Sequence, residues 1–240
     1  MSTLLSKNHH VRPLLTRSTF LGRLPGSVID GLLGKGRLKS LVQGASAYRR
    51  GDPGDSLMVL TKGRIKLTNT SSHGKEIVLH YVGIGEIFGE VAALDGKERA
   101  ADAIALEDAE VFVVSTRDLW PILLTHRDAM RHIVEALCEK IRAVATIIED
   151  NTLEMRCRVA RGLLRLTDQP GRITTDSAHP KLRITQSELG KYLGMSRQTV
   201  NRQLGQLKIA NVISIKGNEI HITDKEGLAD IAQEASQNRK

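Results

Sequence analysis

Gly89, Glu90 and Arg99 stand close together in the chain, at a spacing that suits the binding of a small anion. The first two lie in the string F-G-E-V-A-A-L, and Arg99 follows Glu90 by nine residues and opens the string R-A-A. An arginine beside the backbone N–H groups at the start of a short helix neutralises and orients a phosphate-like group. A carboxylate can accept a hydrogen bond from a hydroxyl group, and a glycine lets the backbone approach closely. A lone glutamate and arginine would be explained equally well by a structural salt bridge, so the complete string carries the prediction.

A second group of polar residues, S-R-Q-T-V-N-R at positions 196–202, has the composition of a helix that reads base edges. Arg197 can bond bidentately to guanine O6 and N7, a contact worth roughly 1–3 kcal/mol of discrimination. Val200 and Leu204 are expected to point inward, away from such a surface. A single helix with this composition could equally be a solvent-exposed charged face. The neighbouring elements therefore decide whether the helix reads DNA.

The elements around residues 196–202 predict a helix-turn-helix followed by a wing. Thr185 and Glu188 form a capping-box pattern at a helix start, and Gly194 ends that helix. Ser196 then caps the next helix, which begins after a four-residue turn. The chain continues into a two-stranded hairpin over residues 212–223, so the reading helix would be the second of the pair.

The charge of the chain is concentrated near its C-terminal end. Residues 1–155 carry 20 Lys+Arg against 19 Asp+Glu, a net of +1, whereas residues 156–240 carry 15 against 8, a net of +7. Such an imbalance is expected of a polyanion-binding module beside a neutral one, because cations gain by releasing the counterions condensed on phosphate. The local charge therefore agrees with nucleic-acid binding by the last third.

The composition excludes several classes of protein. Only 3% of the residues are aromatic, which argues against a platform for stacking single-stranded bases, and two cysteines cannot build a disulfide framework. No stretch approaches 18 apolar residues, so we expect neither a membrane span nor a secretory signal, and we expect a cytoplasmic location. No serine, cysteine or metal-ligand cluster stands beside a base at mechanistic spacing, so we expect no enzyme and no metal.

Before the basic region, residues 41–116 read as short β-strands separated by glycine-rich turns, with a short helix near residues 89–94. Strands at this spacing predict a β-roll or barrel. The strand candidates are residues 56–60, 64–68, 77–82 and 109–114.

The period then changes to that of a helix. Eight residues are spaced 4-3-4-3-4-3-4, which predicts one seam of a long helix with a heptad repeat: Met130, Val134, Leu137, Ile141, Val144, Ile148, Asn151 and Met155. An apolar seam this narrow is typical of a helix that packs against a partner helix, which predicts a homodimer through residues 130–155. The alternative is an amphipathic helix that lies on its own domain. Asn151, the one polar member, would fix the register.

The string from Ile184 to Gly190 and the string at residues 196–202 together resemble the DNA-binding motif of the CRP/FNR family, in its cAMP receptor protein branch. The family pattern has glutamate where this chain has Gln198. Glutamine can donate as well as accept, so this departure affects the middle base preference. The predicted DNA-contacting residues are Ser187, Ser196, Arg197, Gln198, Asn201, Arg202 and Lys216. Of these, Ser187 and Lys216, together with Lys191, are expected to contact phosphates.

The string F-G-E-V-A-A-L with R-A-A resembles the phosphate-binding cassette of cyclic-nucleotide-binding domains. The resemblance implies that Arg99 and the Ala100 amide hold the cyclic phosphate, and that Gly89 and Glu90 hold the ribose. The complete set of predicted ligand-binding residues is Gly89, Glu90, Val91, Arg99, Ala100, Thr146, Leu79 and His80.

The residues that would recognise the base follow less directly from the resemblance than those that would hold the phosphate and the ribose. In cAMP receptor proteins the long helix supplies adjacent threonine and serine hydroxyls, and the matching positions here are Val144 and Ala145. Thr146 is the nearest hydroxyl, and His80 could face the base from its strand. Ala101 leaves room where some cGMP-selective domains carry threonine. We therefore expect cAMP, with cGMP as the open alternative.

The resemblance covers roughly residues 25–232 and implies an α+β fold in three parts. These are an N-terminal β-roll domain with an N-terminal extension (1–127), a coiled-coil dimerisation helix (128–155) and a winged helix-turn-helix domain (156–240). The expected function is a cyclic-nucleotide-dependent transcription regulator that binds palindromic double-stranded DNA and contacts RNA polymerase. Two alternatives remain open: a regulator of the same fold gated by another effector, such as a haem-bound gas, and a ligand-independent DNA binder.

Overall fold

The computed structural model describes residues 9–18, 21–71, 74, 76–167, 173–174 and 180–233. The first eight residues of the predicted N-terminal extension lie outside this set. The chain forms two compact units, residues 1–69 with 79–142 and residues 70–78 with 143–240. Each unit is described by itself below.

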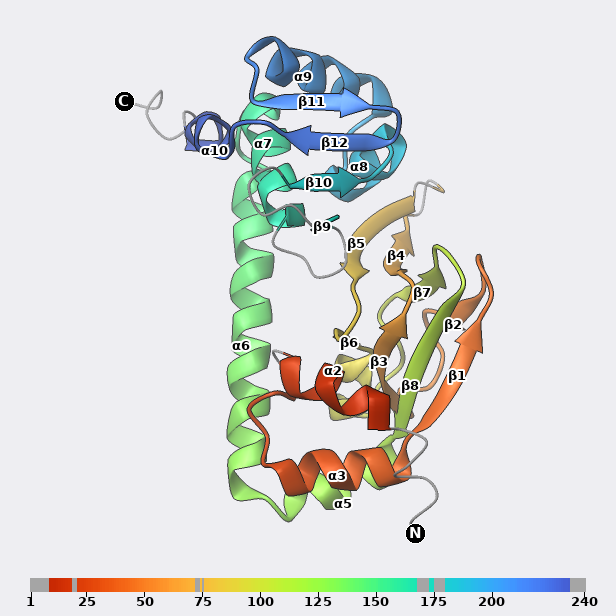
Figure 1. Cartoon of the computed structure of the whole chain (residues 1–240). Helices are drawn as coiled ribbons and strands as arrows, with labels where there is room; N and C mark the ends of the chain where they lie inside the picture. The colour runs from red at the N-terminus through yellow and green to blue at the C-terminus, as the bar shows by residue number, and fades with distance from the viewer. Residues whose placement is uncertain are drawn as a thin grey trace. The chain divides into compact units, whose positions relative to one another are not determined.

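The first unit is built on two four-stranded sheets, labelled in Figure 1. One sheet has the order β1-β8-β3-β6 and the other β2-β7-β4-β5, so strands distant in sequence are neighbours. Strand β8 pairs antiparallel with both β1 and β3, as in the pairing of Val59 on β3 with Phe112 on β8. The strands are β1 (Arg37–Leu41), β2 (Ser46–Tyr48), β3 (Ser56–Lys62), β4 (Ile65–Thr70), β5 (Glu76–Val82), β6 (Ile87–Phe88), β7 (Asp102–Ala105) and β8 (Ala109–Ser115).

The core of this unit has two clusters. Residues of the helices and of strands β3, β6 and β8 form the first, and strand residues of both sheets form the second. The largest apolar side chains of the first cluster, such as Leu32 and Leu119, are almost fully buried, and so are those of the second, such as Leu60 and Ile65. The helical elements are η1 (His9–Val11), α2 (Arg12–Arg17), α3 (Gly26–Lys35), α4 (Glu90–Asp95) and α5 (Thr116–Leu124). The predicted strands and the short helix after Gly89 are confirmed. The sequence did not predict β1, β2, β6, β7, η1, α2, α3 and α5.

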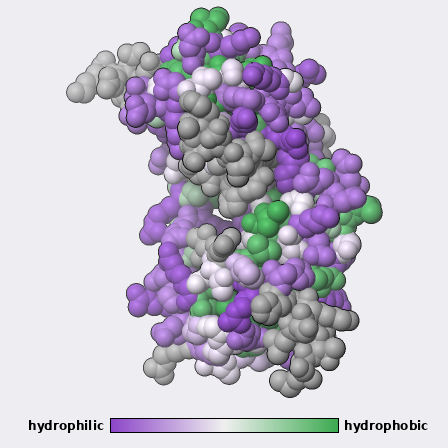
Figure 2. Space-filling view, in the orientation of Figure 1, coloured by the Kyte–Doolittle hydropathy of each residue, from purple (hydrophilic) through white to green (hydrophobic). Residues whose placement is uncertain are grey.

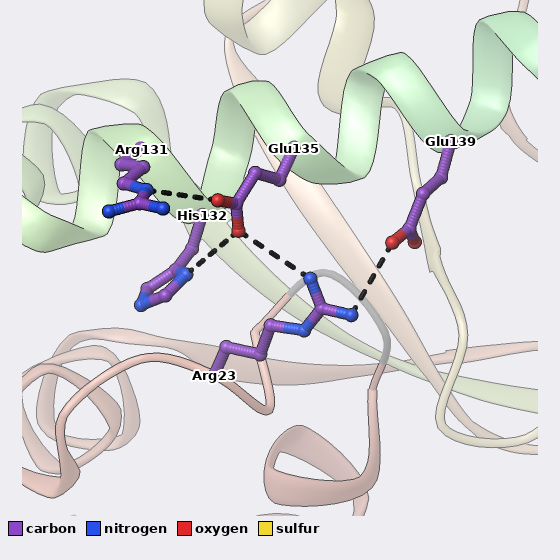
Figure 3. A network of polar contacts seen from close by, with 5 residues as sticks. All are labelled: Arg23, Arg131, His132, Glu135 and Glu139. Atoms are coloured by element: carbon purple, nitrogen blue, oxygen red, sulfur yellow. Dashed lines mark hydrogen bonds and ion pairs between the residues drawn. The ribbon is translucent and has the colours of Figure 1, made fainter.

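A polar network joins the segment before α3 to the long helix α6 (Arg127–Asp150), as Figure 3 shows. Arg23 lies 3.5 Å from Glu135 and 3.4 Å from Glu139, measured between guanidinium nitrogens and carboxylate oxygens. Glu135 also accepts from Arg131 at 3.0 Å and contacts His132 at 3.3 Å. These bonds hold the pKa of Glu135 below its usual value. Exposed pairs of this kind add little stability individually, so the network mainly orients the segment against the helix.

The long helix is shorter than the heptad pattern predicts. It ends at Asp150, and the chain turns before helix α7 begins at Met155. The prediction of one helix through residue 155 is therefore wrong, and so is the placement of Asn151 inside its seam, because that residue is exposed in the turn. The heptad spacing did not reveal the break between α6 and α7, because the same spacing continues across the turn. Four seam residues of α6 are more than half exposed, namely Val134, Ile141, Val144 and Ile148.

The second unit is a small helical domain with a four-stranded sheet of order β11-β12-β10-β9. Thr185 and Glu188 form the predicted capping box, Gly194 ends that helix in the left-handed region, and Ser196 caps the next. The elements are α7 (Met155–Thr167), β9 (Ile173–Thr174), β10 (Lys181–Arg183), α8 (Gln186–Leu193), α9 (Arg197–Ile209), β11 (Ile213–Lys216), β12 (Glu219–Ile222) and α10 (Lys225–Gln233). The helix-turn-helix and its wing are thus confirmed.

The face seen in Figure 2 is mostly hydrophilic, with hydrophobic side chains in small separate groups. Within the described ranges, no helix combines the length and the apolar character that a membrane span requires. In the same residues, no three histidine, cysteine or acidic side chains gather in a way that could hold a metal ion.

Candidate functional site

The candidate ligand site is built around the turn between β6 and α4. Gly89 is the N-cap of α4 and has a φ of 75°, in the left-handed region that glycine adopts without strain. A Cβ at this position would lie 2.6 Å from Nη1 of Arg99 and 3.2 Å from Cε1 of Tyr48. Glycine is therefore favoured at position 89 for two reasons. The backbone angle is left-handed, and the guanidinium of Arg99 occupies the space that a side chain would need.

Arg99 is the most constrained charged group in this region, and its side chain is 2% exposed. Nη1 donates to the carbonyl oxygen of Gly89 at 2.7 Å, and Nη2 donates to the hydroxyl of Ser56 at 2.9 Å. The nearest carboxylate oxygen of Asp55, a largely exposed side chain, is 3.6 Å away. Nε is buried and makes no hydrogen bond within the described part of the chain.

Burial lowers the pKa of Arg99, and nearby anionic groups offset only part of this effect. The guanidinium nevertheless stays charged at neutral pH, because an arginine is not deprotonated in proteins. A buried cation with an unused N–H and an imperfect carboxylate partner favours the binding of an anion. The arrangement therefore suits the cyclic phosphate that the sequence predicts for Arg99.

Glu90, the first residue of α4, is 5% exposed and has a partner that the sequence did not reveal. Nζ of Lys140 on α6 lies 2.5 Å from Oε1 of Glu90. The lysine is half exposed, and its residue number is 50 higher, so no local pattern could have indicated the contact. Oε2 of Glu90 remains able to accept a hydroxyl hydrogen bond, which is the ribose role that the resemblance implies.

The other predicted ligand residues are placed less tightly. Val91 is 52% exposed and Leu79 is 46% exposed, while Ala100 is exposed beside Arg99. His80 is half-buried and its Nε2 lies 2.5 Å from Oε1 of Glu86, so this nitrogen is already engaged. A base contact by His80 would have to use its other nitrogen, and the contact stays a prediction.

Thr146 lies on the part of α6 that belongs to the second unit, and its side chain is exposed. Its role with the base stays a prediction. Val144 and Ala145 are exposed as well and offer no hydroxyl. Cassette residues Gly89, Glu90 and Arg99 are thus brought together by direct contacts or adjacency.

The candidate DNA-reading surface is the first half of α9. Arg197, Gln198, Asn201 and Arg202 are all exposed. The apolar residues Val200 and Leu204 of the same helix are buried, at 0% and 1% exposure, as the sequence predicts. The helix therefore presents one polar face and packs the other.

The N-terminal end of α9 is fixed by its cap. The hydroxyl of Ser196 accepts from the amide of Thr199 at 3.1 Å, so the N–H groups of the first turn are partly satisfied. Ser187 on α8 and Lys216 at the end of β11 are exposed, as phosphate contacts would require. Their contacts with DNA stay predictions.

Two family models match the parts of the chain that contain the two candidate sites. Residues 38–126 match the model of the cyclic nucleotide-binding domain, and residues 157–231 match the Crp-like helix-turn-helix domain. The chain is 29% identical over 191 residues to the cyclic AMP receptor protein of Thermus thermophilus, covering 79% of this chain and 85% of that protein.

Two solved structures are similar over most of the chain. A CRP-family transcriptional regulator from Thermus thermophilus has a TM-score of 0.67 and 25% identity, covering 82% of this chain and 97% of that one. The c-di-GMP-responsive global regulator CLP of Xanthomonas campestris has a TM-score of 0.68 and 21% identity, covering 82% and 99%. The second shows the fold alone.

The relatives and structural neighbours are transcriptional regulators and not enzymes, which agrees with the expectation from the sequence. The two matched domains stand in the order that the cassette and the helix-turn-helix predicted. With a cyclic nucleotide-binding domain followed by a Crp-like DNA-binding domain, the chain belongs to the CRP/FNR family of transcriptional regulators.

Proposed function

We propose that this regulator is a homodimer that binds palindromic DNA when cAMP occupies its β-roll. The observation that carries the proposal is the buried Arg99 guanidinium, which is held against Gly89 with one N–H unused. Arg99 and the Ala100 amide would hold the cyclic phosphate, and Glu90 would accept from a ribose hydroxyl. The small side chain of Ala101, where some cGMP-selective domains carry threonine, favours adenine over guanine.

Dimerisation is supported by the exposed seam of α6. Val134, Ile141, Val144 and Ile148 are 54–68% exposed on one stripe, and an apolar stripe with heptad spacing is typical of a helix that pairs with a second copy. Two copies of α9 would then read two half-sites about one DNA turn apart. A cytoplasmic location and a contact with RNA polymerase follow from this role and belong to the same proposal.

The experiment is a calorimetric titration of the full-length protein with cAMP, cGMP and c-di-GMP, each with and without a palindromic duplex. We expect cAMP to bind most tightly and to raise DNA affinity, and Arg99→Ala to lower cAMP affinity by at least about tenfold, since it removes a charge-assisted bond. Arg64→Ala is the matched control, because Arg64 forms a partly exposed pair with Glu107 in the same unit. Equal DNA affinity with and without every nucleotide would contradict the proposal and favour a ligand-independent DNA binder.

A further inference from the structure

Tyr48 is an aromatic residue that contacts both ends of the phosphate cassette. It ends strand β2 and is 9% exposed. Cζ of Arg99 lies 4.4 Å from the centroid of its ring, within the range of a cation–π contact. The ring of Phe88, the residue before Gly89, has its centroid 5.9 Å from that of Tyr48. One side chain therefore packs against both the start and the end of the cassette.

The stacked ring restricts how an anion can reach the guanidinium. Arg99 bonds to Gly89 and Ser56 through its two terminal nitrogens, and its Nε is unused within the described residues. Cζ of Arg99 lies over the ring of Tyr48, so this side of the guanidinium is closed to a ligand oxygen. A guanidinium binds phosphate most strongly through its N–H groups.

We infer that Tyr48 is a positioning residue of the nucleotide site, whose ring holds the Arg99 guanidinium in the orientation in which it binds an incoming phosphate. The inference rests on the proposed function, because it assumes that Arg99 binds the phosphate. It adds a residue from outside the cassette to the determinants of affinity. The ring, and not the hydroxyl, carries the effect.

The electrostatic environment of Tyr48 agrees with this role. Burial raises the pKa of its hydroxyl, an effect that Arg99 partly offsets and Glu90 reinforces. The phenol therefore stays neutral over the working pH range. A neutral ring stacks on the cation without neutralising it, so the positive charge of Arg99 remains available to an anion.

The first measurement is cAMP affinity by calorimetry for Tyr48→Phe and Tyr48→Leu. Phenylalanine keeps the stacking face, so we expect affinity within about twofold of the wild type. Leucine removes it, and we expect affinity to fall by about 5- to 30-fold, the range of a desolvated cation–π contact. Tyr81→Leu is the control for lost packing, because Tyr81 is a buried ring on β5 of the same sheet arrangement.

The second measurement needs no ligand. The Nε–H signal of Arg99 in an NMR spectrum, assigned by its loss in Arg99→Lys, should be shifted by the ring current in the wild type and in Tyr48→Phe. In Tyr48→Leu the shift should disappear, while Tyr81→Leu should leave it unchanged. A signal that is insensitive to Tyr48→Leu would overturn the inference, whether or not the variant has lost stability.

Two further outcomes would also overturn the inference. One is an unchanged cAMP affinity in Tyr48→Leu, and the other is an equal loss in Tyr48→Phe, which would assign the effect to the hydroxyl. A wild-type protein that binds neither cAMP nor cGMP would contradict the proposed function instead. The NMR signal would in that case still decide whether Tyr48 holds the guanidinium.

Discussion

The ammonium group of Lys140 on α6 lies 2.5 Å from a carboxylate oxygen of Glu90 on α4. The glutamate side chain is 7% exposed and the lysine side chain 46%. Removing the lysine leaves a buried carboxylate without its cation, which costs far more than loss of a surface pair. This contact joins the cassette to the long helix, and its removal has a measurable consequence.

Lys140→Met should lower the free energy of unfolding by about 1–2 kcal/mol, less than for a fully buried pair because the lysine is half exposed. Urea unfolding of the full-length protein measures this. Lys97→Met is the control, since Lys97 is 81% exposed and pairs with Asp95 at the surface. We expect the control to change stability by no more than about 0.5 kcal/mol. Equal losses in the two variants would show that the contact with Glu90 is not stabilising.

Asp150→Asn should destabilise the second unit by about 2–4 kcal/mol. Asp150 is the last residue of α6 and is 1% exposed, and both Arg161 and Arg165 of α7 donate to its carboxylate, Arg161 at 2.8 Å. Its loss of charge leaves two partly buried guanidinium groups without an anion. Hydrogen exchange of the α7 amides measures the loss, and the exposed neighbour Glu149, changed to glutamine, is the control. If both variants exchange at the same rate, the paired arginines do not anchor the end of the helix.

The pair of Glu86 and His80 predicts a dependence of stability on pH. Burial raises the pKa of Glu86, but hydrogen bonds from His80 and the Gly83 amide more than offset this, so its net pKa lies below the ordinary value of 4.5. A depressed folded pKa means that the stabilisation is present above 4.5 and is lost as the pH falls through the folded pKa. The difference in unfolding free energy between wild type and Glu86→Gln should therefore shrink as the pH is lowered from about 5 to about 3. A difference that stays constant over this range would refute the assignment.

Ile141→Glu should dissociate the proposed homodimer. Ile141 is 68% exposed on the seam of α6, and burying an isoleucine from each chain contributes about 1.5–3 kcal/mol apiece. We expect the dissociation constant to rise by at least about 100-fold in sedimentation equilibrium. Ala143→Glu adds the same charge to an exposed position off the seam and should leave the dimer intact. A wild type that sediments as a single chain at every concentration would remove the dimer from the proposal.

Arg197→Ala should reduce sequence discrimination. If Arg197 bonds to a guanine, the ratio of specific to non-specific affinity should fall by about tenfold or more per half-site at fixed salt. Lys216→Ala, at an exposed wing position, should instead weaken binding to all sequences and lower the salt slope by about 1. Competition binding against a mutated operator measures both effects. An unchanged ratio in Arg197→Ala would mean that the reading surface lies elsewhere on α9.

The sequence predicted the features that depend on neighbouring residues. The capping box of Thr185 and Glu188, the left-handed Gly194 and the cassette string from Gly89 to Arg99 are all short-range signals, and the structure contains each of them. Such features can be predicted from the sequence because a few adjacent residues determine a cap or a tight turn.

The features that the sequence did not predict depend on contacts between distant parts of the chain. Lys140 reaches Glu90 and Tyr48 reaches Arg99 across 50 or more residues, and no period or motif encodes such pairs. The position at which α6 ends was not predicted for a different reason. The heptad spacing continues past Asp150, whereas the helix ends at this residue, whose carboxylate pairs with arginines of α7.

The close approach of Arg99 to Gly89 has a consequence for how the site can change. A methyl group on Gly89 would collide with the guanidinium of Arg99. Gly89→Ala would therefore displace this guanidinium from its present position, although it removes no charged group. Loss of the anion site therefore does not require loss of the arginine. Any relative that keeps the arginine but carries a side chain at the glycine position would have to hold its ligand by other means.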